Sequence, residues 1–137
     1  MSRSRKLWWI LAITIILVVG IISGGRYLIQ ERPHQQLTVV VPKLSPEAAA
    51  GETVFSANCA VCHGKNAAGT DKGPPLIDPI YRPAHHGDFS FVRAVTLGVP
   101  QHHWLFGAMP AQPQVTREQI DQIVTYIREI QRANGIN

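Results

Sequence analysis

The longest continuous hydrophobic stretch lies near the amino terminus, where residues 7–25 include no charged side chain. As an α-helix, these 19 residues would extend roughly 28 Å, about the thickness of the hydrocarbon layer of a bilayer. Trp8 and Trp9 stand at one end of the stretch, where an interfacial aromatic belt is expected. The pattern predicts one transmembrane helix within residues 1–29.

Charged residues around this stretch predict its orientation. Arg3, Arg5 and Lys6 precede it, and a mixture of basic and acidic residues follows it. The positive-inside rule then places the amino terminus in the cytoplasm and the rest of the chain on the periplasmic side of the inner membrane. A cleaved signal peptide is the competing interpretation, but its apolar region is normally about 7 to 15 residues long and ends in an Ala-x-Ala-like site. The length favours a retained anchor.

Residues 30–44 have the composition of a linker. Their first half is polar, and Pro33 and Pro42 disfavour a helix. Val39 to Val41 favour an extended conformation that lies against the surface of the following domain. His34 is interpreted as a solvated linker side chain. We therefore expect a periplasmic linker at 30–44 and a folded domain at 45–137.

Helical signals divide the domain into three helices. Ser45 and Pro46 form a helix start, with Ser45 as the N-cap, and the helix runs towards Cys62. Asp88 is expected to cap a second helix over 89–97. Apolar residues at helical spacing define the buried stripe of the last helix, which follows a capping box at 116–119: Ile120, Ile123, Val124, Ile127 and Ile130. No strand alternation is visible, so the sequence predicts an all-α domain.

A long irregular segment separates the first two of these helices. It contains Gly73-Pro74-Pro75 and further prolines at 79 and 83. Such a segment is unusual in a compact domain unless something other than protein fills the core. The sequence therefore predicts a buried cofactor.

Charge segregation excludes a nucleic-acid-binding domain. The formal net charge is +4, but residues 1–44 hold six basic and one acidic side chain, whereas residues 45–137 hold seven basic and eight acidic ones. The excess positive charge belongs to the anchor and the linker. The folded part has no basic stripe interleaved with aromatic residues, so no nucleic-acid partner is expected.

Cys59-Ala-Val-Cys62-His63 contains the only two cysteines of the chain. On a helical turn, positions i, i+3 and i+4 share one face. Two thiols can then form thioethers with the vinyl groups of one haem while the imidazole reaches the iron, and C-x-x-C-H is the pattern of c-type haem attachment. The rival interpretations are a thioredoxin-like redox pair, which requires a βαβ context that is missing, and half of a zinc site, which requires two more ligands. The motif favours one covalent haem c.

Beyond this motif, residues 45–134 resemble a class I cytochrome c of the membrane-anchored, single-haem bacterial type. Gly51 and Phe55, four residues apart, resemble the family's small residue and aromatic that pack against an aromatic of the last helix. Tyr126 stands in the matching position for that aromatic. The resemblance implies a cytochrome c-like three-helix haem domain after the transmembrane helix.

Two further motifs follow along the chain in the same order as in the class I cytochromes c. Gly73-Pro74 resembles the family's Gly-Pro, which implies that the Pro74 carbonyl accepts a hydrogen bond from Nδ1 of His63 and sets its tautomer. Met109-Pro110 resembles the Met-Pro loop that brings a thioether to the iron. The resemblance therefore implies His63 and Met109 as the two iron ligands.

The role of Met109 can also be considered without the family resemblance. The other methionine, Met1, belongs to the opposite side of the membrane in the predicted topology. Met109 follows the second helix in a loop stiffened by Pro110 and Pro113. A lone methionine is more often a core residue than a ligand, so spacing alone leaves both interpretations open.

Two histidine pairs, His85-His86 and His102-His103, complicate the assignment. Any of them could compete for the iron, and bis-histidine ligation would lower the potential that a thioether raises. His85-His86 can also be read as polar loop residues, and His102-His103 as packing at the haem edge. A further interpretation is a second metal site, with copper as the candidate, although the sequence spacing of the histidines defines no site. Trp104 is expected at the haem edge, with a haem propionate as a partner for its indole N–H.

Two protein ligands on the iron would leave no position for a substrate. The sequence therefore predicts an electron carrier rather than an enzyme, with membrane or periplasmic redox proteins as partners and no small-molecule substrate. Two other functions remain open. The chain could be a haem subunit docked permanently in a larger oxidoreductase complex, or a periplasmic copper-linked redox protein that uses the histidine pairs.

Overall fold

The computed structural model describes residues 3–28 and 37–137, and within the first range it describes side chains at 8, 9 and 11–21. The chain divides into two compact units, Met1–Pro33 and His34–Asn137. The first half of the expected linker, including His34, lies outside the described residues. The charged side chains that flank the apolar stretch lie outside them as well.

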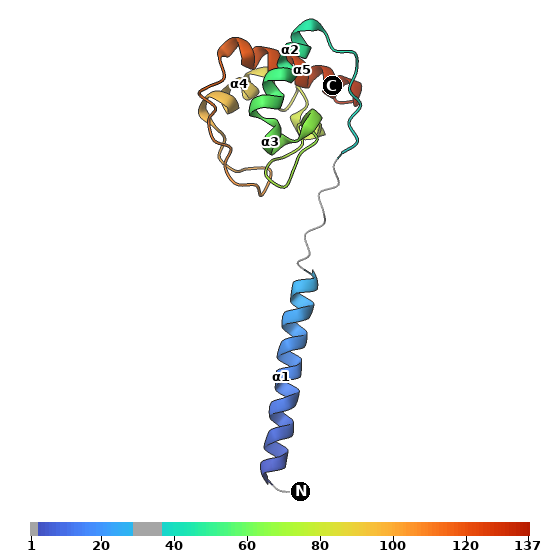
Figure 1. Cartoon of the computed structure of the whole chain (residues 1–137), viewed down its shortest axis with the longest axis vertical. Coiled ribbons are helices and arrows are strands. Elements are labelled where there is room, and N and C mark those ends of the chain that lie inside the picture. The colour runs from blue at the N-terminus through green and yellow to red at the C-terminus, as the bar shows by residue number, and fades with distance from the viewer. Residues whose placement is uncertain (1–2, 29–36) are drawn as a thin grey trace. The chain divides into compact units, whose positions relative to one another are not determined.

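Helix α1 spans Arg3–Leu28 and contains the apolar stretch (Figure 1). All of its described side chains are exposed, and the large apolar ones range from 53 % exposed at Val18 to 76 % at Trp8. Within the part of the chain that the structure describes, no helix is both long enough and apolar enough to cross a membrane. The transmembrane anchor therefore stays a prediction.

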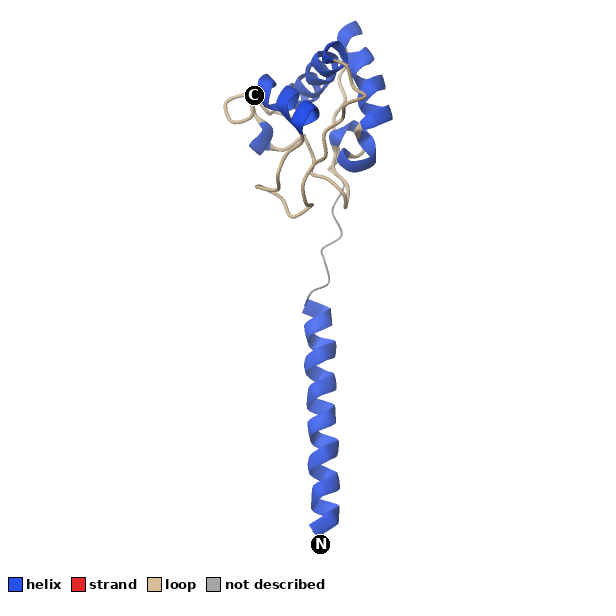
Figure 2. Ribbon diagram, turned by 90° about the vertical axis from the view of Figure 1, so that its left-hand side faces the viewer, coloured by secondary structure: helices blue, strands red, loops and turns tan. Residues whose placement is uncertain are grey.

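The carboxy-terminal unit is mostly helical (Figure 2). Among residues 37–137, the one pairing of extended chain is an isolated antiparallel bridge between Val99 and Met109. The three expected helices correspond to α2, α4 and α5, and the break at Cys59 that separates α2 from α3 was not expected. The helices and short 3₁₀ helices are α2 Pro46–Asn58, α3 Ala60–His63, η1 Lys65–Ala67, η2 Pro79–Tyr81, α4 Asp88–Leu97 and α5 Arg117–Ala133.

Helices α2 and α5 form the main packing contact of this unit. A Cβ atom added to Gly51 would lie 2.0 Å from the backbone oxygen of Gln122, so only glycine allows the two backbones to approach this closely. The rings of Phe55 and Tyr126 are buried and pack with their centroids 5.5 Å apart. The contact expected between the first and last helices is confirmed. The expected apolar stripe of α5 is also buried at all five positions: Ile120, Ile123, Val124, Ile127 and Ile130.

The helix ends agree with the sequence signals except at α4. Ser45 caps α2 by accepting a hydrogen bond from the N–H of Ala48, and Thr116 forms the expected capping box with Gln119 at α5. At α4, however, the N-cap is Gly87, and Asp88 is the first helical residue. The expectation that Asp88 caps this helix is wrong, because its carboxylate binds a buried arginine of α5 instead.

The extended segment before α2 is attached to the carboxy-terminal unit. The backbone N–H and C=O of Val40 both bond to the side chain of Asn134, at 3.0 and 2.8 Å. Val39 and Leu44 pack against the core, and the N–H of Ser45 donates to Glu129 at 3.0 Å. Hydrogen bonding by the side chain of Ser45, followed by this backbone N–H, lowers the pKa of Glu129. Residues 37–44 thus belong structurally to the folded unit.

Candidate functional site

The two cysteines and the histidine that follows them lie where α2 ends and α3 begins. Cys59 closes α2, and the N–H groups of Cys62 and His63 donate to its carbonyl at 3.1 and 2.9 Å. The motif therefore forms one helical turn. No disulfide joins the two cysteines; Cys59 is buried and Cys62 is partly exposed. Burial, with a smaller effect of Cys62, raises the pKa of Cys59 to about 11, so this thiol is protonated near neutral pH.

The side chain of His63 is fixed by the loop that follows it. Its Nδ1 lies 2.9 Å from the carbonyl oxygen of Pro74, as expected. Burial lowers the pKa of His63, and the hydrogen bond to Pro74 only partly offsets this effect. The imidazole is therefore neutral at neutral pH. Because the carbonyl can only accept, Nδ1 carries the proton and the lone pair of Nε2 is available to a metal.

Close backbone contacts hold this loop against the cysteine motif. A Cβ atom on Gly73 would lie 2.9 Å from the carbonyl oxygen of Cys62. The same carbonyl accepts a hydrogen bond of 2.5 Å from the hydroxyl of Thr70, and the carbonyl of His63 accepts one of 2.7 Å from the N–H of Gly69. The glycine before Pro74 thus lets the proline carbonyl reach the imidazole.

A cavity of about 380 Å³ opens beside His63. Five of the six predicted site residues line it, namely His63 itself, Cys59, Pro74, Trp104 and Met109. Cys62 is not part of the lining. Apolar side chains form most of the remaining wall: Phe55, Leu76, Phe89, Phe91, Ala94, Val95, Val99, Phe106, Ile120, Ile123 and Val124.

Met109 reaches this cavity from a loop attached to the end of α4. Its N–H and C=O both bond to Val99, each at 2.9 Å. Gly98 ends α4 with φ +76°, and a Cβ atom there would lie 2.6 Å from the carbonyl oxygen of Met109. A residue other than glycine would therefore displace the Met109 backbone. The half-buried side chain of Met109 remains on the cavity wall.

Trp104 lies on the cavity wall, but its indole N–H has a partner within the protein. It donates to the hydroxyl of Tyr81 at 3.1 Å. The propionate partner stays a prediction. Tyr81 is 23 residues away in the sequence, so no local pattern indicated this contact. Burial raises the pKa of Tyr81 despite the opposing effect of this hydrogen bond. The pair joins the segment before α4 to the loop after it.

The two histidine pairs, separated in the sequence, come together in space. The ring centroids of His85 and His103 are 5.6 Å apart, and those of His86 and His103 are 5.3 Å apart. His102 also approaches His86, at 6.3 Å. Desolvation and the three neighbouring imidazoles lower the pKa of His103. His86, His102 and His103 all line the cavity.

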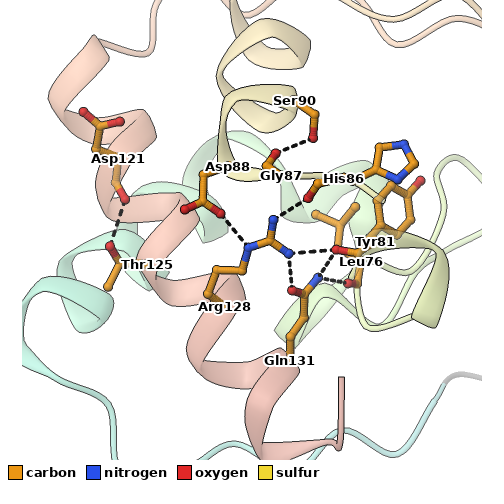
Figure 3. Close-up of polar contacts among 10 residues, drawn as sticks. All are labelled: Leu76, Tyr81, His86, Gly87, Asp88, Ser90, Asp121, Thr125, Arg128 and Gln131. Atoms are coloured by element: carbon orange, nitrogen blue, oxygen red, sulfur yellow. Dashed lines mark hydrogen bonds and ion pairs between the residues drawn. The ribbon is translucent and has the colours of Figure 1, made fainter. Parts of the chain in front are cut away.

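A buried polar pair on α5, Arg128 and Gln131, was not expected from the sequence (Figure 3). Arg128 donates through Nε to Asp88 at 2.8 Å, through Nη1 to the carbonyl of Tyr81 at 2.7 Å, and through Nη2 to the carbonyl of His86. Gln131 donates to the carbonyl of Leu76 at 2.9 Å. These bonds anchor the irregular segment before α4. Their helical spacing was the available sequence signal, because it places Arg128 and Gln131 beside the apolar stripe of α5 and so indicates burial.

The residues that line the cavity beside His63 fit a haem. The cavity walls are mainly apolar, as a porphyrin requires, and a buried cysteine and an imidazole with a free Nε2 stand on the wall. The chain would hold the group through Cys59 and Cys62, with His63 and Met109 as the available iron ligands. The second cysteine is a neighbour on the same helical turn, and it is partly exposed.

The comparisons with known proteins agree with this site. The cytochrome c family model matches residues 48–131. The chain is also 30 % identical, over 89 residues, to the Cbb3-type cytochrome c oxidase subunit CcoP of Rhodobacter capsulatus. That match covers 61 % of this chain but only 29 % of the relative, and no solved structure matches. The domain therefore binds haem c covalently and transfers electrons, and the chain belongs to the cytochrome c family.

Proposed function

We propose that this protein is a membrane-tethered electron carrier of a respiratory chain, with haem thioethers at Cys59 and Cys62 and iron bound by His63 and Met109. One observation carries the proposal: a single, mainly apolar cavity is lined by Cys59, by Met109 and by an imidazole whose tautomer leaves Nε2 available. Two protein ligands leave no coordination position for a substrate, which supports electron transfer rather than catalysis.

A haem held here supplies the Fe(III)/Fe(II) couple, and the chain sets its properties. The Pro74 carbonyl orients the imidazole of His63 and raises its basicity as a ligand. The thioether of Met109 favours the ferrous state and so raises the potential. The apolar wall excludes water, which disfavours the additional charge of the ferric form.

Exposed apolar side chains near the cavity provide a docking surface for redox partners. Phe89 lines the cavity and is 74 % exposed. Leu105, between the lining residues Trp104 and Phe106, is 93 % exposed. Residues 45–137 carry almost no net charge, so we expect transient docking that depends on apolar contact and only modestly on salt.

The amino-terminal helix is proposed as the tether, with the haem domain on the periplasmic side of the inner membrane. The 19-residue uncharged stretch and the exposure of its described apolar side chains support this topology. A tether keeps the domain near membrane partners and so offsets weak docking. The mature protein should resist carbonate extraction and have an intact mass that includes residues 1–25. A mature terminus near residue 26 would contradict the anchor.

A second candidate is a haem subunit docked permanently in an oxidase, which the similarity to the CcoP subunit favours. Purification in mild detergent distinguishes the two. A carrier elutes as a single chain, whereas a docked subunit co-purifies at fixed stoichiometry with partner chains.

Carbon monoxide tests the proposed coordination directly. The reduced protein should bind it slowly or not at all, because Met109 occupies the position that the gas requires, and the unmodified protein should show negligible peroxidase turnover. Prompt binding with substantial turnover would indicate an open iron site, and the carrier assignment would then be withdrawn.

A further inference from the structure

The cluster formed by the two histidine pairs has no role in the proposed electron carrier. One ligand nitrogen from each of His85, His86 and His103 can be chosen so that all three lie within 4.8 Å of one another. Three imidazole nitrogens at such a separation can surround one ion with little movement. We propose that His85, His86 and His103 bind a transition-metal ion that prefers imidazole ligands, with Cu(II) the tightest of the divalent series.

The side chain of His86 is already oriented as metal-bound histidines usually are. Its Nδ1 lies 2.7 Å from the carbonyl oxygen of Ile80. A backbone carbonyl on one ring nitrogen fixes the tautomer and directs the other nitrogen, here Nε2, to the ion. His85 and His103 are exposed, so an ion can enter from solvent.

Hydrogen bonds from the buried Arg128 and to Arg82 hold the backbone of the first histidine pair. Arg128 donates to the carbonyl of His86 and to the carboxylate of Asp88, on either side of Gly87 (Figure 3). The N–H groups of His85 and His86 both donate to the carbonyl of Arg82, at 3.0 and 2.8 Å. A pair fixed in this way loses little conformational entropy when it binds an ion.

The second pair is brought to the first by a separate contact. The hydrogen bond from Trp104 to Tyr81 links the residue after His103 to the segment that precedes His85. The rings of Tyr81 and His86 also pack, with centroids 5.1 Å apart. Side-chain packing therefore unites histidines from two loops, which is a stronger indication of a site than adjacent histidines in one exposed loop.

Neighbouring His102 provides a matched control. It lies in the same loop as His103 and is also exposed. Its Nδ1 lies 2.9 Å from the carbonyl oxygen of Pro100, and it is not one of the three clustered ligands. A general attraction of metal to surface histidines would use both residues, whereas the proposed site uses only His103.

The experiment is equilibrium dialysis of the haem-loaded, full-length ferric protein against Cu(II) and, separately, Zn(II), followed by metal analysis. We expect one saturable equivalent per chain, with Cu(II) bound more tightly than Zn(II). His85→Asn and His103→Asn should each weaken binding by roughly 10-fold or more, since loss of even an outer-shell contact costs about 10–100-fold. His102→Asn should change the affinity by less than about 3-fold.

Two results would overturn the proposal. One is equal weakening by His102→Asn and His103→Asn, which would indicate unspecific binding. The other is a change in the ferric haem spectrum of His103→Asn with metal affinity retained, which would make this histidine an iron ligand. The iron-ligand result would also contradict Met109 as a ligand, whereas equal weakening would leave the proposed carrier function intact.

Discussion

The His63 and Met109 sides of the cavity differ in how firmly the protein holds them. His63 is 9 % exposed, and its imidazole and the neighbouring carbonyls are bound by a loop whose glycines allow backbone contact. Met109 comes from a loop in which the residues at 101–103, 105 and 107–108 are exposed. Its attachments include the Val99 bridge, the bond between Trp104 and Tyr81, and the bond from the N–H of Gln112 to the carbonyl of Val95 at 2.8 Å.

This difference has a functional consequence. We expect the rigid His63 side to keep the cofactor attached and its imidazole oriented, and the proposed ligand on the other side to be exchangeable without unfolding of the domain. The potential is therefore expected to be set mainly by the Met109 loop. Substitutions on the His63 side should affect folding, and those on the Met109 side should affect the spectrum and the potential.

The largest effect is expected from removing both attachment points. Cys59→Ala with Cys62→Ala should leave no haem on the chain after a denaturing gel, and the domain should be poorly folded because the empty cavity lacks the partner of its apolar wall. Each single variant retains one thiol and is the matched control. Haem that is extracted freely from the unmodified protein by acid acetone would contradict covalent attachment.

Gly51→Ala should have the next largest effect. The added methyl group would overlap the backbone oxygen of Gln122, and that atom belongs to a helix and cannot rotate away. We expect a loss of unfolding free energy on the order of 3 kcal/mol, measured by denaturant titration of the haem-loaded protein. Ser56→Ala, at an exposed position of α2, should be nearly neutral. An unchanged Gly51→Ala protein would mean that the helices cross less closely.

The sequence predicted the His63 side better than the Met109 side. The local C-x-x-C-H motif, the capping residues and the Gly-Pro signal act over a few residues, so each could be read directly. Phe55 and Tyr126 were identified through the family resemblance and by helical spacing. Contacts between distant segments could not be predicted, because no local sequence pattern encodes them.

Three of these distant contacts show what could not be predicted from the sequence. Asp88 carries a typical cap signal, yet a buried guanidinium 40 residues away binds its carboxylate. The indole N–H of Trp104 donates to the hydroxyl of Tyr81, which is 23 residues away in the sequence. His85 and His103 have no meaningful sequence spacing, and only the folding of two loops brings them together.

Met109→Ala should change the spectrum and potential more than stability. The ferric protein should lose its weak far-red sulfur-to-iron band, and the midpoint potential should fall because the thioether no longer favours ferrous iron. Absorption spectroscopy with a redox titration measures both. Leu105→Ala, at an exposed position of the same loop, should retain the band. Absence of the band from the unmodified protein would instead favour a histidine ligand from the 102–103 pair.

The smallest effect is expected at the hydrogen bond between Tyr81 and Trp104. Tyr81→Phe removes only the phenol oxygen, and a double-mutant cycle with Trp104→Phe separates the hydrogen bond from changes in ring packing. The coupling should be about 1 kcal/mol in unfolding free energy, the usual net value of one hydrogen bond. Tyr81→Phe should also lower the temperature at which the far-red band is lost. Covalent haem attachment should stay complete, because other hydrogen bonds hold Cys59 and His63. If the cycle shows no coupling and the band is unaffected, this hydrogen bond does not hold the Met109 loop, which then depends on its bonds to Val99 and on the bond from Gln112 to Val95.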